Sequence, residues 1–150
     1  MIMTLTSLLL VALLGGPLAV AERSPAVAGE KITVYKSKTC GCCGKWVEHL
    51  QKAGFDVTVH VVDSVDNAPG RDRVPAELRS CHTASVKRYV IEGHVPADVM
   101  KDFLAKNPEL EGLAVPGMPA GSPGMESPTP QPYEVIVWDR TGKKTTFAKR

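Results

Sequence analysis

A strand–helix–strand unit between residues 31 and 62 constrains the fold more than any other feature of the sequence. Residues 31–35 alternate in polarity and are rich in β-branched side chains, which predicts a strand. Residues 43–54 place apolar side chains on one helical face, and residues 55–62 alternate again. Two strands joined through a helix are expected to run parallel with a right-handed crossover. The unit therefore predicts an α/β fold.

The middle of the chain extends this unit to a thioredoxin-like order of elements. Residues 63–74 are polar and rich in turn formers, and a short helix is expected over 75–80. A hairpin over 83–93, turning at residues 87–88, precedes a second helix over 96–106. The order β-α-β followed by β-β-α is the thioredoxin-like core that we predict.

Two further segments complete the predicted fold. Residues 107–132 are rich in proline and glycine, which is typical of a linker. They also contain Leu113 and Val115, which a solvated linker does not need, so we expect an ordered loop packed against the domain. Residues 133–147 predict a C-terminal β-hairpin that turns at 140–142 and extends the sheet.

The first 21 residues have the pattern of a secretory signal peptide. An apolar run covers residues 8–14, and the small residues Ala19 and Ala21 fit cleavage after Ala21. The run is too short to cross a bilayer, which takes roughly 20 apolar residues, so no membrane-spanning segment is expected. We predict a signal peptide at 1–21, a flexible lead at 22–30 and one domain at 31–150.

The low net charge of the chain argues against nucleic-acid binding. The formal net charge is only +2, and the sequence has neither a basic cluster nor a series of stacking aromatic side chains. No nucleic-acid partner is therefore expected.

Three of the four cysteines stand within four positions. Cys40, Cys42 and Cys43 form a C-x-C-C motif at the end of the first predicted strand and the beginning of the first helix. In an oxidising compartment thiols close into disulfides unless a metal or a redox partner intervenes. A disulfide framework would spread its cysteines along the chain, so this spacing indicates a site. The carboxyl ends of strands in α/β units are where such sites tend to lie.

The fourth cysteine is expected to join this cluster. In the predicted topology the loop before the third strand lies beside the first helix, and here that loop carries Cys81 and His82. Soft sulfur ligands select Cu(I), Zn(II) or iron–sulfur clusters. The spacing lacks the paired knuckles of structural zinc sites and the wider spread of iron–sulfur frameworks. Closely packed thiolates favour Cu(I), with bridging of more than one ion.

Other soft or borderline donors are candidates at the same site. His94 follows a strand end on the expected side of the sheet, and Met118 and Met125 lie in the Gly/Pro-rich segment. His49 and His60 are expected to face solvent, from the polar side of the first helix and of the second strand.

Four segments together resemble the CopG-type family of copper-resistance proteins, a former domain of unknown function. They are the stretches TCGCCGKWVEHLQKAGF, LRSCHTASV, YVIEGHVPADV and GLAVPGMPAGSPGME. The resemblance implies a thioredoxin-like fold, the periplasm of a Gram-negative bacterium, and copper bound by the C-x-C-C and C-H motifs. On this chain those motifs are Cys40, Cys42, Cys43, Cys81 and His82. Periplasmic copper transporters or chaperones are the partners expected for such a protein.

Two classes of function remain open from the sequence. The first is copper binding in copper homeostasis, with Cu(I)/Cu(II) redox activity as an open feature. The second is a thiol–disulfide oxidoreductase in which Cys40 attacks, Cys43 resolves and Cys81 modulates. Whether the chain is an enzyme therefore stays undecided, and a purely structural zinc module is disfavoured by the dense motif.

The signal peptide leads to a direct prediction about the mature chain. After expression in a Gram-negative host, intact-mass measurement of the periplasmic protein should give a chain that begins at Glu22. A chain beginning at Gly29 would place the cut after the second small-residue motif, residues 26–28. An uncleaved cytoplasmic product would contradict export.

Overall fold

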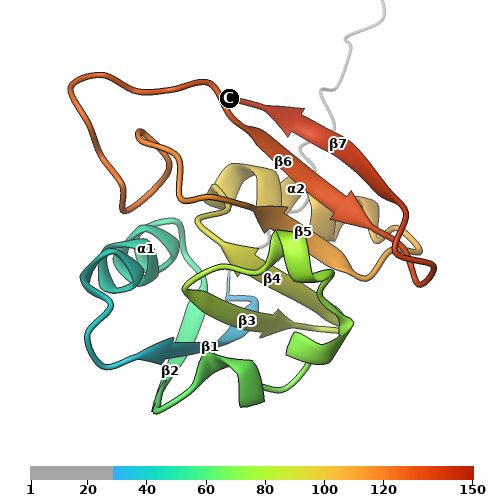
Figure 1. The fold of residues 1–150 in the computed structure, drawn as a ribbon, viewed down its shortest axis with the longest axis horizontal. Helices are drawn as coiled ribbons and strands as arrows, with labels where there is room; N and C mark the ends of the chain where they lie inside the picture. Colours follow the sequence, from blue (N-terminus) through green and yellow to red (C-terminus); the bar gives the residue numbers. More distant parts are fainter. Residues whose placement is uncertain (1–28) are drawn as a thin grey trace, which may run out of the picture.

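A single mixed β-sheet forms the centre of the computed structural model, which describes residues 29–150 (Figure 1). The predicted signal peptide and most of the predicted lead lie outside these residues. Within residues 29–150, two α-helices and seven strands follow one another, and the strands lie in the order β2-β1-β3-β4-β5-β6-β7. The strands are β1 (Lys31–Ser37), β2 (Asp56–Val62), β3 (His82–Val86), β4 (Tyr89–Gly93), β5 (Gly112–Val115), β6 (Glu134–Trp138) and β7 (Lys144–Lys149).

The first unit has the predicted β-α-β arrangement. Strands β1 and β2 pair in parallel along their full lengths, and α1 (Gly41–Lys52) connects them. Helix α1 begins two residues earlier than predicted and has Cys40 as its N-cap, so Cys42 and Cys43 lie in its first turn. Its inward face carries Trp46, Val47 and Leu50, as expected from the sequence.

The hairpin predicted over 83–93 is confirmed. Strand β3 pairs antiparallel with both β1 and β4, and the connection is the two-residue turn Lys87–Arg88. Lys87 adopts a φ of 52°, a left-handed conformation that non-glycine residues rarely adopt. Helix α2 (Ala97–Lys106) follows β4, with Pro96 at its N-cap.

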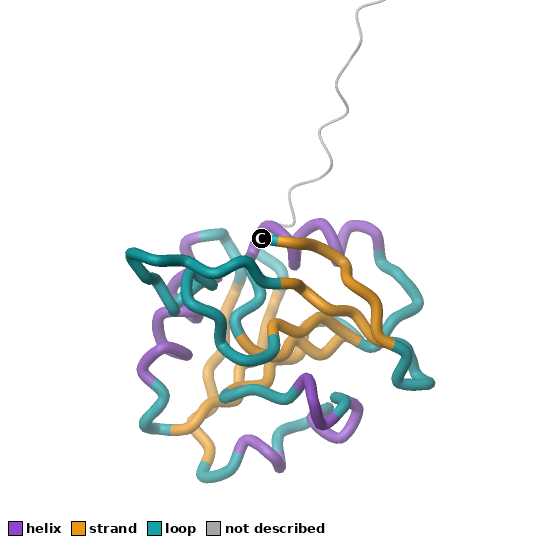
Figure 2. The backbone as a smooth tube through the Cα atoms, turned by 45° about the horizontal axis from the view of Figure 1, so that its top comes forward, coloured by secondary structure: helices purple, strands orange, loops and turns teal. Residues whose placement is uncertain are grey.

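The short helix predicted over 75–80 is present as a 3-10 helix and is shorter than expected. Residues 76–78 form one turn of 3-10 helix, and two similar turns cover Val65–Asn67 and Arg71–Arg73. Gly70 and Pro75 interrupt this stretch, so no piece is long enough for a stable α-helix. The three turns lie across the sheet from α1 and α2 (Figure 2).

The loop predicted over 107–132 contains a strand that the sequence analysis did not identify. Strand β5 pairs in parallel with β4 and antiparallel with β6, and all four of its residues are buried. A four-residue apolar run surrounded by proline and glycine carries little periodic signal, which explains the omission. The rest of the segment is an ordered loop that packs on the domain, as expected, before the predicted β6–β7 hairpin.

The sheet has an apolar layer on each face. On the helix face, α1 and α2 bury side chains against strands β1, β3, β4, β5 and β6. On the other face, a smaller cluster joins the 3-10 turns to β4, β5 and β6, through Val74, Leu78, Val90, Ala114 and Trp138. Strand β2 is an edge strand, so the alternating pattern of 55–62 leaves Val59 and Val61 exposed by 39% and 60%. No helix of residues 29–150 is long and apolar enough to cross a membrane.

Close packing at β5 makes Gly112 a test of this sheet order. A Cβ atom at Gly112 would collide with the Val90 carbonyl of β4 and lie 2.7 Å from the Trp138 ring of β6. Gly112→Ala is therefore expected to lower the free energy of unfolding by about 3 kcal/mol. Gly44→Ala is the control, since nothing lies within 4 Å of that position in α1. It should raise stability by about 0.5–1 kcal/mol. Urea unfolding measures both, and equal effects would contradict the order.

Candidate metal centre

The candidate site lies where β1 ends, α1 begins and β3 begins. Cys40 and Cys43 are joined by a disulfide, with their Cα atoms 5.4 Å apart. Cys42 and Cys81 are free thiols and are half-buried. The disulfide closes the first turn of α1, so the site as described is in an oxidised state.

The four sulfurs come together as the predicted topology requires. The Cys42 sulfur lies 3.5 Å from that of Cys40, and the Cys81 sulfur lies 3.5 Å from that of Cys43. All four sulfurs lie within 4.8 Å of one another. The register of β3 against β1, which pairs His82 with Lys36, brings Cys81 to the helix end across 38 residues of sequence.

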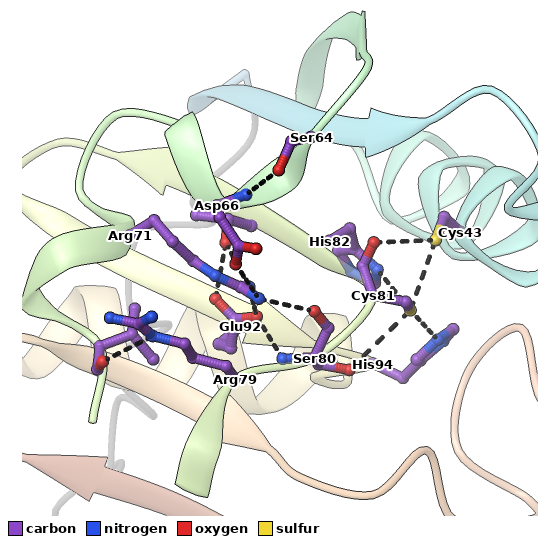
Figure 3. Close-up of polar contacts among 12 residues, drawn as sticks. Cys43, Ser64, Asp66, Arg71, Arg79, Ser80, Cys81, His82, Glu92 and His94 are labelled. Atoms are coloured by element: carbon purple, nitrogen blue, oxygen red, sulfur yellow. Dashed lines mark hydrogen bonds and ion pairs between the residues drawn. The ribbon is translucent and has the colours of Figure 1, made fainter. Parts of the chain in front are cut away.

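Two histidines form a second group of donors around Cys81. The Cys81 sulfur lies 3.4 Å from His82 Nδ1 and 3.5 Å from His94 Nε2 (Figure 3). The other ring nitrogen of His94, Nδ1, lies 2.8 Å from the Pro123 carbonyl and donates to it, which leaves Nε2 as the unprotonated nitrogen facing Cys81. Cys81 therefore belongs both to the sulfur cluster and to a Cys-His-His group.

His82 is held in a dry environment. Its ring packs 4.3 Å from that of Trp46 and 5.0 Å from that of His94, and it is fully buried. Burial lowers the pKa of His82 to about 3, with His94 adding to the effect. The Gly93 carbonyl opposes this shift, but Nε2 still has no hydrogen bond of normal geometry in the described residues. His82 is thus a neutral imidazole with an unpartnered nitrogen.

Burial also governs the free thiol of Cys81. It raises the pKa of Cys81 to about 11; the Ser80 hydroxyl opposes this rise and the neighbouring Cys42 adds to it. The thiol is protonated at neutral pH, and a bound cation would be needed to stabilise its thiolate.

The ordered loop after β5 covers one side of the site. A Cβ atom at Gly124 would lie 2.6 Å from the Cys42 carbonyl oxygen and 2.9 Å from the backbone nitrogen of Trp46. Only glycine therefore allows the loop to come this close to α1. Of the two predicted thioether ligands on this loop, Met118 is exposed and Met125 is half-buried. Their roles as ligands stay predictions.

His49 differs from its expected solvent-facing position. It is half-buried, and its Nε2 accepts a hydrogen bond of 3.0 Å from the backbone N–H of Ala97, at the beginning of α2. Helix N-termini leave such donors free, which explains why the imidazole turns inward. His60 is exposed on β2, as expected, and stacks on Tyr35.

A buried ion pair lies beside the site and was not predicted from the sequence. Arg71 pairs with Glu92, and both side chains are almost completely buried. Arg71 falls in a stretch whose polarity suggests only a surface turn. Glu92 could have indicated the pair from the sequence, because a charged residue inside the apolar strand 89–93 requires a buried partner.

The donor set fits a soft cation. Thiolate sulfur and neutral imidazole suit Cu(I) and, less selectively, Zn(II), whereas hard cations prefer oxygen. Among the described residues, neither of the two donor groups contains a carboxylate. His82 Nδ1 and His94 Nε2 both face the Cys81 sulfur, so two imidazole nitrogens stand beside the sulfur cluster.

Known proteins with similar sequence and structure agree with this arrangement. The sequence profile of a family described as "Protein of unknown function, DUF411" matches residues 78–125, which include Cys81, His82 and His94. Two solved structures, described as copper resistance protein CopG in form 1 and form 2, are each 38% identical to this chain with a TM-score of 0.76. Each similarity covers 81% of this chain and 98% of the solved chain. No curated protein matches.

The buried imidazoles lead to a pH prediction for the metal-free, disulfide-bonded protein. The pKa values of His49, His82 and His94 are all lowered by burial, so below pH 6.5 the unfolded chain binds protons that the folded chain does not. Stability should therefore fall as the pH drops from 6.5 to 5. His82 alone should contribute about 1 kcal/mol per pH unit averaged over that window.

Urea unfolding at a series of pH values measures this slope. His82→Gln should reduce the slope by the equivalent of about one bound proton. His94→Gln should reduce it by less. A wild-type stability that is flat between pH 6.5 and 5 would contradict the buried neutral imidazoles.

Proposed function

The chain belongs to the family of CopG copper resistance proteins, and from that premise we propose that it binds Cu(I) as part of copper homeostasis. Cys40, Cys42, Cys43 and Cys81 are the proposed sulfur ligands. The observation that carries the proposal is the convergence of all four cysteines, one of them from a distant strand, within 4.8 Å of each other. Thiolate is the softest ligand that a protein offers, and Cu(I) is a soft cation.

The number of sulfurs favours more than one ion. Four thiolates in so small a volume repel one another unless cations lie between them. A sulfur that bridges two Cu(I) ions reduces the number of ligands needed per ion. The middle cysteine of the C-x-C-C motif, Cys42, is then a bridging ligand rather than a surplus one.

The imidazoles and thioethers complete the proposed site. His82 and His94 are neutral nitrogen donors beside Cys81, so copper held by the sulfurs has nitrogen ligands on one side. Met118 and Met125 are proposed to complete or gate the site from the covering loop, since thioethers are soft ligands that tolerate oxidation-state changes.

Full use of the four sulfurs requires reduction of the disulfide. Opening the Cys40–Cys43 bond takes two electrons and two protons and releases two thiols. Oxidation of two Cu(I) ions to Cu(II) would supply the two electrons. The same site therefore supports either sequestration of Cu(I) or its oxidation to Cu(II).

The alternative, a thiol–disulfide oxidoreductase with Cys40 and Cys43, is not favoured. We infer a thioredoxin-like core from strands β4-β3-β1-β2 with α1 and α2, and that core is shared by many oxidoreductases. However, fold does not fix function. Free thiols stand 3.5 Å from both sulfurs of the disulfide, and a Cys-His-His group adjoins it, which suits a metal better than a protein substrate.

The family and the predicted signal peptide support a proposal about location and partners. We propose that the mature chain works in the periplasm of a Gram-negative bacterium. Its ligand is copper, and periplasmic copper transporters or chaperones are the proposed partners that deliver or receive it.

Anaerobic titration of the reduced protein with Cu(I) against a competing chelator tests this function. The wild type should bind at least two tight Cu(I) per chain. Cys81→Ser should lower this stoichiometry although it lies outside the first cluster, and His94→Gln should weaken the affinity. His60→Gln is the matched control, because His60 is an exposed histidine on β2 that belongs to neither donor group.

Insulin reduction, run on the same preparation, separates the two classes of function. Negligible reductase activity together with tight Cu(I) binding supports the copper site. Efficient reductase activity with no Cu(I) binding would replace it with the oxidoreductase.

A further inference from the structure

We propose that the buried Arg71–Glu92 ion pair is a positioning device that fixes the Cys81 segment against the end of α1. This inference rests on the proposed copper function and adds two residues to it that touch no proposed ligand atom. Figure 3 shows the ion pair on one side of Ser80 and the sulfur–imidazole cluster on the other.

Both members of the pair hold the backbone of the same residue. The Glu92 carboxylate accepts a hydrogen bond of 2.6 Å from the Ser80 N–H, and Arg71 Nη2 donates one of 3.0 Å to the Ser80 carbonyl. Arg71 Nη1 donates to Glu92 itself and, at 3.0 Å, to Thr83. We call Arg71, Glu92, Ser80 and Thr83 the Ser80 clamp.

The clamp holds a segment that the sheet does not. The pairing of β3 with β1 ends at His82, so Ser80 and Cys81 lie beyond the ladder. Gly93 gives this segment room, because a Cβ atom there would lie 3.0 Å from the Ser80 hydroxyl and 2.5 Å from the Val115 carbonyl. Without the clamp, the backbone on the N-terminal side of Cys81 would be free to shift.

The proposed metal donors and the clamp residues lie on opposite faces of β3. His82 points to the helix face and packs on Trp46, whereas the Thr83 hydroxyl donates to Glu92 on the opposite face. On the β4 side the separation has another cause: Glu92 belongs to the clamp, and His94 lies beyond the end of β4, after Gly93 with its positive φ of 71°, and belongs to the donor group. The stretches 80–83 and 92–94 therefore each carry both a metal donor and a clamp residue.

A gain in folding stability does not by itself explain the buried Arg71–Glu92 pair. A buried ion pair gains little over a well-packed apolar pair, because two charges must be removed from water. Arg71 Nε also remains without a hydrogen-bond partner within the described part of the chain. What an apolar pair cannot provide is a donor and an acceptor for the two backbone groups of Ser80.

The double substitution Arg71→Met with Glu92→Leu tests the clamp, because it removes both charges together. The metal-free variant should stay folded with a somewhat lower urea midpoint, because removal of the charges offsets only part of the hydrogen bonds that Ser80 and Thr83 lose. Its Cu(I) affinity, measured against a competing chelator, should fall by about 10–100-fold, as for other residues that orient ligands.

Arg71→Lys is the second variant, in case the double variant does not fold. It keeps the charge beside Glu92, but a single ammonium cannot reproduce the planar guanidinium fork that also reaches Ser80. Its Cu(I) affinity should also fall, with the fold intact. Glu111→Gln is the matched control, since it weakens the Arg73 and Arg140 ion pairs away from the site.

The outcomes separate the two proposals. Wild-type Cu(I) affinity in a folded Arg71→Lys or double variant would overturn the clamp and leave the copper function standing. A wild type that binds no Cu(I) would instead overturn the function itself. A loss of affinity as large in Glu111→Gln as in the clamp variants would also contradict a specific role.

Discussion

The pairing of β3 beside β1 is the constraint on which the rest of the site depends. This antiparallel register ends at His82 and Lys36, directly next to the first turn of α1. It converts a separation of 38 residues into a sulfur–sulfur distance of 3.5 Å. Strand β4 then returns to bring His94 to the same place, so one hairpin supplies a sulfur and two nitrogens to a helix end that supplies three sulfurs.

Burial gives these donors their chemical character. His82 and His94 are kept neutral because the surroundings disfavour the protonated imidazole, and Cys81 stays a thiol until a cation compensates its charge. Backbone groups then orient the donors: the Pro123 carbonyl fixes the His94 tautomer, and the Ser80 clamp holds the segment before Cys81. The donors of the proposed copper site are therefore held in place by groups that are not among the proposed ligands.

Much of this arrangement could be predicted from local patterns. The β-α-β unit follows from hydrophobic periodicity and the handedness of the crossover, and the position of Cys81 follows from the thioredoxin-like order of elements. Strand β5 and the Arg71–Glu92 pair could not be found in this way. The first is too short and too rich in neighbouring glycine and proline, and the second depends on two distant residues whose partnership exists only after folding. The contact of His49 on α1 with Ala97 on α2 likewise joins residues that meet only after folding.

X-ray absorption at the copper edge of the reduced, Cu(I)-loaded protein tests the central claim most directly. The account predicts copper coordinated mainly by sulfur, with a copper–copper scattering contribution from ions bridged by the cysteines. Coordination by nitrogen and oxygen without sulfur would contradict it.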